Sequence, residues 1–77
     1  MNSTQRKKID SIKSALEAIR ADVESLRDAE QEAFDGMSEK SQESERGQKI
    51  SESADALSSA ADSLESAFDD LDNAASE

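Results

Sequence analysis

The sequence predicts an all-α protein, an antiparallel two-helix hairpin with coiled-coil-like packing. Three observations predict it: the chain has no proline and only two glycines, apolar residues recur at spacings of three and four in both halves, and a polar stretch separates the halves. A disordered segment of this charge would not need such periodic placement. With 77 residues, the chain is expected to form a single domain over residues 1–77.

The first helix is predicted over residues 3–35, with Ser3 or Thr4 as its N-cap. Its apolar residues keep a strict period of 3.5, which favours coiled-coil packing over an ordinary surface helix. Glu30 continues the same frame at an inward position, and we expect it to be half-buried, pairing with Arg27 or fixing the register. The apolar positions are Ile9, Ile12, Leu16, Ile19, Val23 and Leu26.

The connection is predicted over residues 36–46, which are polar and leave room for one short turn of helix. Gly36 is expected to end the first helix in a left-handed cap. Arg46 is expected to cap the carbonyls of the first helix or to pair with an acid nearby. Three serines are candidate N-caps for the next helical segment: Ser38, Ser41 and Ser44.

The second helix is predicted over residues 47–75, and the sequence leaves open whether Gly47 interrupts it or lies within it. Four heptads run from Ile50 to Glu77. Their first column holds Ile50, Leu57, Leu64 and Leu71, and their fifth holds Ala54, Ala61, Phe68 and Ala75. The expected antiparallel register pairs Ile19 with Phe68, Leu26 with Ala61, Lys13 with Asp72 and Arg20 with Glu65.

Two helices alone bury one thin stripe, so a chain of this size is expected to need further support. The second helix also carries an alanine row, Ala60, Ala67 and Ala74, which would let another helix approach closely. We therefore expect a homodimer that forms a four-helix bundle through this row. The competing interpretation is that alanine is simply a good helix former.

The composition argues against several function classes. There is no cysteine or histidine, so thiolate ligands, the commonest metal ligand and the usual general base are missing. We expect no enzymatic activity, no metal site and no cofactor. No apolar run approaches the ~20 residues of a membrane span, and a net charge of −10 disfavours direct binding to nucleic acid or to anionic membranes.

The remaining functional feature is an acidic surface on the second helix, which carries no basic residue from Ile50 onward. Its expected partner is a protein with a basic surface. A sharper alternative is a DNA mimic that occupies the basic groove of a nucleic-acid enzyme, and a third is a scaffold element that assembles through the alanine row. Solubility alone would also explain acidic faces. The partner-binding residues are predicted to be Asp55, Asp62, Asp69, Glu65 and Asp72.

The segment 27–47 contains a helix end rich in Glu and Gln, a Phe-Asp-x-Met turn and a Ser-Glu-Arg-Gly stretch, and heptads follow it. In these features it resembles a group of short acidic proteins of uncharacterised role from tailed bacteriophages and prophages. It departs from the pattern at Ser38, where a proline commonly follows the methionine. The resemblance implies a phage origin and the cytoplasm of a bacterial host, and it implies no specific activity. The matching residues are Glu30, Gln31, Glu32, Phe34, Asp35, Met37, Gln42, Ser44, Glu45, Arg46 and Gly47.

Overall fold

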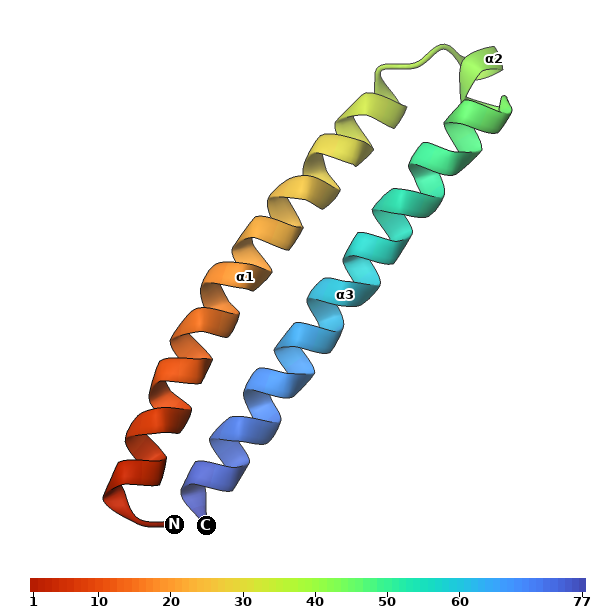
Figure 1. Cartoon of the computed structure of the whole chain (residues 1–77). Coiled ribbons are helices and arrows are strands. Elements are labelled where there is room, and N and C mark those ends of the chain that lie inside the picture. Colours follow the sequence, from red (N-terminus) through yellow and green to blue (C-terminus); the bar gives the residue numbers. More distant parts are fainter.

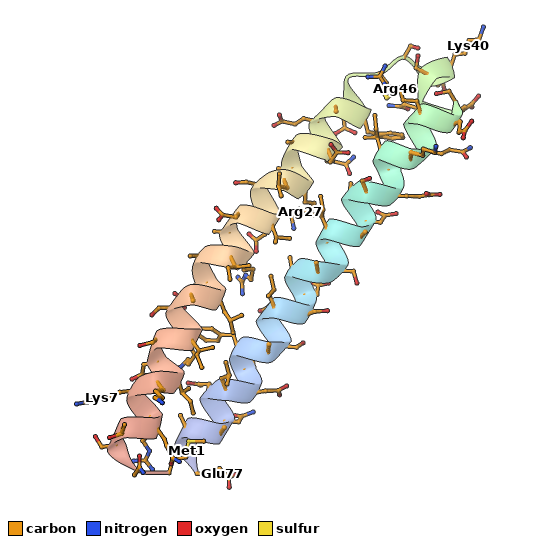
Figure 2. All side chains as sticks on the ribbon, viewed as in Figure 1. Met1, Lys7, Arg27, Lys40, Arg46 and Glu77 are labelled. Atoms are coloured by element: carbon orange, nitrogen blue, oxygen red, sulfur yellow. The ribbon has the colours of Figure 1, made fainter.

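The computed structural model describes residues 1–77 and confirms the all-α class. Three helices succeed one another along the chain: α1 (Ser3–Asp35), α2 (Glu39–Gln42) and α3 (Glu45–Ser76). The two long helices lie side by side and run in opposite directions (Figure 1). The molecule is an elongated rod of 58 × 15 × 12 Å, with Met1 and Glu77 at the same end (Figure 2).

α1 is capped by Asn2, not by the predicted Ser3 or Thr4. The Asn2 side chain accepts a hydrogen bond of 2.8 Å from the backbone N–H of Gln5, and the Gln5 side chain accepts one of 3.2 Å from the backbone N–H of Asn2. This reciprocal pair is a capping box, in which the residue three positions beyond the cap reaches back to it. The spacing of Asn2 and Gln5 therefore decides where the helix begins.

No residue of the connection has a positive φ. Gly36 ends α1 at φ −78°, so the predicted left-handed cap is wrong; its N–H donates to the Glu32 carbonyl at 3.0 Å. Ser38 caps α2 and Ser44 caps α3. The carboxamide of Gln42 donates to the carbonyl of Phe34 at 2.9 Å and ties α2 back to the end of α1.

Gly47 lies within the first turn of α3 and is buried. The backbone of α2 crosses so closely that a Cβ at this position would lie 2.5 Å from the Gln42 carbonyl oxygen and would also overlap the Ser41 carbonyl. Glycine is required here because no side chain fits between the two short backbone segments. The chain is thus able to turn into α3 with little intervening loop.

α1 and α3 bury little between them. Only Ile9, Ala54 and Ala61 are buried apolar residues, and no large side chain is fully enclosed. α3 presents its two predicted heptad columns to α1. α1 presents two rows of residues, each spaced by seven positions, to α3. The central row begins with Ile9, Leu16 and Val23. The second, which we call the basic row, consists of Lys13, Arg20 and Arg27 and is continued by Phe34.

The row Ile12, Ile19 and Leu26, which we call the isoleucine row, does not take its predicted inward position. These side chains remain 48%, 48% and 58% exposed. The expected pairing of Ile19 with Phe68 and of Leu26 with Ala61 assumed that they point at α3, and that assumption is wrong. Instead α1 is turned about its axis so that its basic row lies beside α3. The long aliphatic stems of Lys and Arg cover apolar surface while their charged ends reach solvent or an acid.

We expect Gly47→Ala to destabilise the protein, because the added methyl group would meet carbonyl oxygens of the backbone that cannot move independently. A clash of this kind costs about 1–3 kcal/mol, against a gain of about 1 kcal/mol for alanine in a helix. The thermal unfolding midpoint, followed by circular dichroism at one fixed protein concentration, should fall by several degrees.

Gly36→Ala is the matched control. Its φ is open to any residue, and the nearest atom to an added Cβ is the Glu32 carbonyl oxygen at 3.3 Å. An equal loss of stability in both variants would show that general glycine effects, and not the close approach at Gly47, determine the result.

Candidate functional site

Two long sides of the rod differ in chemistry, and neither is an enclosed pocket. The three surface depressions are open grooves along the helices. Nowhere do three or more Asp or Glu side chains converge in a group that could hold a metal ion. None of the helices offers an apolar stretch of the length that a bilayer crossing needs. The candidate functional features are therefore surfaces.

The first side, called the charged side, is organised around Lys13. Its Nζ donates to Asp72 Oδ1 across the two helices at 2.6 Å and lies 4.8 Å above the centre of the Phe68 ring. This confirms the expected Lys13–Asp72 pair. The expected pair of Arg20 with Glu65 is wrong, since Arg20 Nε bonds Glu24 Oε1 at 3.0 Å within its own helix.

The pKa of Lys13 is raised above its ordinary value of 10.5. The hydrogen bond to Asp72 is the largest cause, and it outweighs the partial desolvation that lowers the pKa. The charges of Asp72, Asp10 and Glu17 add to the increase. Lys13 is therefore the clearest electrostatic link between α1 and α3, with a side chain that is only 18% exposed.

The predicted acidic residues are all exposed on α3. Asp55, Asp62 and Asp69 recur every seven residues and so form one row along the helix, which we call the acidic row. Glu65 and Asp72 form a second row, nearer to α1. Asp72 is the only acid of α3 after Ile50 that has an ion pair. The other acids of this stretch have no basic partner within the chain.

The second side, called the apolar side, combines the predicted alanine row of α3 with residues of α1 that were expected to face inward. Leu26, Ala29 and the half-buried Glu30 of α1 line a groove with Ser53, Ala56 and Leu57 of α3. Ser53 begins the row that continues, at intervals of seven residues, through the predicted alanine row. The isoleucine row and the alanine row (Ala60, Ala67 and Ala74) therefore flank the same side of the rod, opposite Lys13 and Asp72.

The pairings expected for Glu30 and for Arg46 are absent from the structure, although the expected burial of Glu30 is present. Glu30 is half-buried, as expected, but Arg27 pairs with Asp28 at 3.0 Å and not with Glu30. Arg46 is exposed and makes no ion pair or hydrogen bond; Gln42 caps the Phe34 carbonyl in its place. Arg46 lies at the connection end of the rod (Figure 2) and lines an open groove with Lys49.

Comparisons with models of protein families, with curated proteins and with solved structures found no match to this chain. The surfaces must therefore be interpreted from their own chemistry.

Removing the Asp72 carboxylate should return the pKa of Lys13 toward its ordinary value. A folded-state pKa above 10.5 means that Lys13 contributes stability in full below the unfolded-state value, and that this contribution is lost as the pH rises through the folded-state value. NMR titration of the Lys13 side chain in the wild type and in Asp72→Asn measures the pKa. Urea unfolding midpoints, determined at a pH below the unfolded-state pKa of Lys13 and at a pH above its folded-state pKa, measure the change in stability.

Asp69→Asn is the control, because it removes the same charge about one turn away without touching Lys13. It should leave the Lys13 pKa close to the wild-type value. A Lys13 pKa that is the same in the wild type and in Asp72→Asn would mean that the ion pair is not populated in solution.

Proposed function

We propose that this protein is a non-enzymatic interaction module, a helical hairpin that acts by binding another protein. The partner carries a basic surface and meets the acids of α3. The consequence of binding is inhibition or redirection of that partner, since the hairpin itself offers no catalytic group. The phage origin implied by the resemblance in residues 27–47 would make a bacterial host protein the target.

The observation that supports this proposal is the unpaired charge on α3. Eight acids lie between Ile50 and Glu77 without a basic residue among them, and only Asp72 is neutralised by an ion pair. Like charges along one helix repel one another, and an external cationic surface relieves this repulsion. Rows of exposed carboxylates also raise the rate of encounter with a basic partner.

The active form in this proposal is a homodimeric four-helix bundle. A single hairpin encloses only three apolar residues, and small cores of this kind are commonly completed by association. Dimerisation would also double the number of exposed acids that one assembly presents.

The proposal is tested by neutralising the acidic row. The triple variant Asp55→Asn, Asp62→Asn and Asp69→Asn should lose the partners that the wild type retains in an affinity pull-down from bacterial lysate at low salt. Each removed contact is exposed and worth only tenths of a kcal/mol to about 1 kcal/mol, so three together should weaken binding by roughly threefold to a hundredfold.

A matched control removes three charges elsewhere: Glu32→Gln, Glu39→Gln and Glu43→Gln. These residues are exposed and form no ion pair. Retention of the same partners by the Asp→Asn variant would contradict the acidic surface as the binding site. Loss by both variants would point to net charge alone.

A DNA mimic is the second candidate function, and the acidic row favours it. Eight acids over this stretch correspond to about one charge per 5 Å of helix axis, compared with one per ~1.7 Å in duplex DNA. The charges of one hairpin are too widely spaced to imitate a duplex, whereas a dimer with two such rows has a charge density closer to that of DNA. The partner in this case is a DNA-binding enzyme.

Competition separates this candidate from other basic partners. A DNA mimic should displace duplex DNA from the captured partner in a fluorescence anisotropy assay, and displacement should be lost above ~0.3 M salt, where exposed charges are screened. A partner that binds the hairpin and DNA simultaneously would exclude mimicry while leaving the acidic binding surface in place.

A further inference from the structure

The isoleucine row is unusual for a surface. Ile12, Ile19 and Leu26 are each about half exposed or more, and they recur every seven residues on one line along α1. Single exposed apolar residues are common on proteins, but a contiguous line of them marks an interaction site. Of the neighbouring outward positions, Ala15 and Ala29 are exposed and uncharged, and Asp22 between them is an exposed acid.

The structure points to a second copy of this chain as the occupant of the apolar side: we infer that two hairpins pack through the isoleucine and alanine rows, with a two-fold axis parallel to the helices. This inference rests on the homodimer of the proposed function and assigns its surface. It leaves the acids of the charged side free for a partner.

The area of the apolar side is sufficient for a stable dimer. The rod is 58 Å long and 15 Å wide, so its broad side offers about 900 Å², close to the ~800 Å² per partner of a standard specific interface. Its exposed residues are chiefly apolar or small, apart from Asp22 beside the isoleucine row and Asp70 beside the alanine row. Full burial of a side chain such as Ile or Leu is favourable by about 1.5–3 kcal/mol, and each copy contributes three that are about half exposed.

The isoleucine row and the alanine row complement each other in side-chain size and in position along the long axis of the rod, which we call height. The contact of Lys13 with Asp72 and the groove shared by Leu26 with Ser53 and Leu57 define the antiparallel register. In this register each large residue of α1 lies close to the height of an alanine of α3 on the same side of the rod. The matched positions are Ile12 with Ala74, Ile19 with Ala67 and Leu26 with Ala60.

This complementarity selects the direction of the two-fold axis. An axis parallel to the helices places α1 of one copy on α3 of the other, so each large side chain packs on an alanine. An axis perpendicular to the helices would set isoleucine on isoleucine and alanine on alanine. The two helix pairs would then need different separations, and one of them would leave a void.

Charge agrees with the same arrangement. The basic start of α1, Arg6, Lys7 and Lys8, lies at the same end of the rod as the acidic end of α3 (Figure 1). There Asp70 is exposed between Ala67 and Ala74, and it is not one of the partner-binding acids. The parallel axis sets the basic start of each copy beside the acidic end of the other. Within one chain Lys7 points away from α3 (Figure 2), so this basic end remains free for such contacts.

The inference is tested first by oligomeric state. Sedimentation equilibrium should find the wild type as a dimer at micromolar concentration, and Ile19→Glu should raise the dimer dissociation constant at least tenfold, because the dimer would bury unpaired charges. Ala18→Glu is the matched control: it adds the same charge at the adjacent exposed position, which faces outward, and should dimerise nearly as the wild type does.

Cysteine cross-linking provides a second measurement that does not rely on a disruptive change, and the chain has no cysteine of its own. Chains carrying Ile19→Cys mixed with chains carrying Ala67→Cys should form a disulfide-linked heterodimer on mild oxidation, since these positions would face each other. Ile19→Cys alone should cross-link at least tenfold less. Efficient cross-linking of Ile19→Cys alone would overturn the parallel axis.

The outcomes distinguish this surface from the proposed function. A wild-type protein that is monomeric up to 100-fold above micromolar concentration would contradict the homodimer itself. A wild-type dimer that Ile19→Glu leaves intact, with no Ile19–Ala67 cross-link, would overturn the apolar side as the interface while the homodimer stands. Partner capture by the acidic row is read in a separate pull-down and does not depend on either result.

Discussion

The rest of the structure depends on one geometric constraint: each of two paired helices can bury only one narrow stripe against the other. α1 carries more apolar rows than this stripe can hold. Its central row, Ile9, Leu16 and Val23, faces α3, and the basic row beside it completes the contact. The isoleucine row must therefore face solvent in a single hairpin, and this exposure defines the second side of the molecule.

The sequence allows much of the fold to be predicted, and the reason is local. The two helices result from unbroken heptads without proline, and capping by Ser38 and Ser44 reflects the preference of serine for that position. The rotation of α1 could not be obtained in this way. Rows three and four residues from the central row are equally placed to join it, and apolar content alone favoured Ile12 over Lys13.

An interaction between distant residues reverses that choice. The Lys13 ammonium reaches both the Asp72 carboxylate and the Phe68 ring, so one side chain makes an ion pair and a cation–π contact in the same place. The seven-residue spacing of Lys13, Arg20 and Arg27 was the signal in the sequence. Its importance depends on the fifth heptad column of α3, where the small residues Ala54, Ala61 and Ala75 leave room for the aliphatic parts of long basic side chains. Likewise the alanine row was recognisable from its spacing, whereas the exposure of the isoleucine row on α1 was not.

The position of the chain ends has a practical meaning for this rod. Met1 and Glu77 lie together at one tip, and the connection forms the other (Figure 2). With a two-fold axis along the rod, all four termini would gather at one tip and both connections at the opposite one. The assembly would then be polar, with two chemically different tips. Tethered by its termini, it would stand upright on a support with its connections uppermost and its acidic flanks unobstructed.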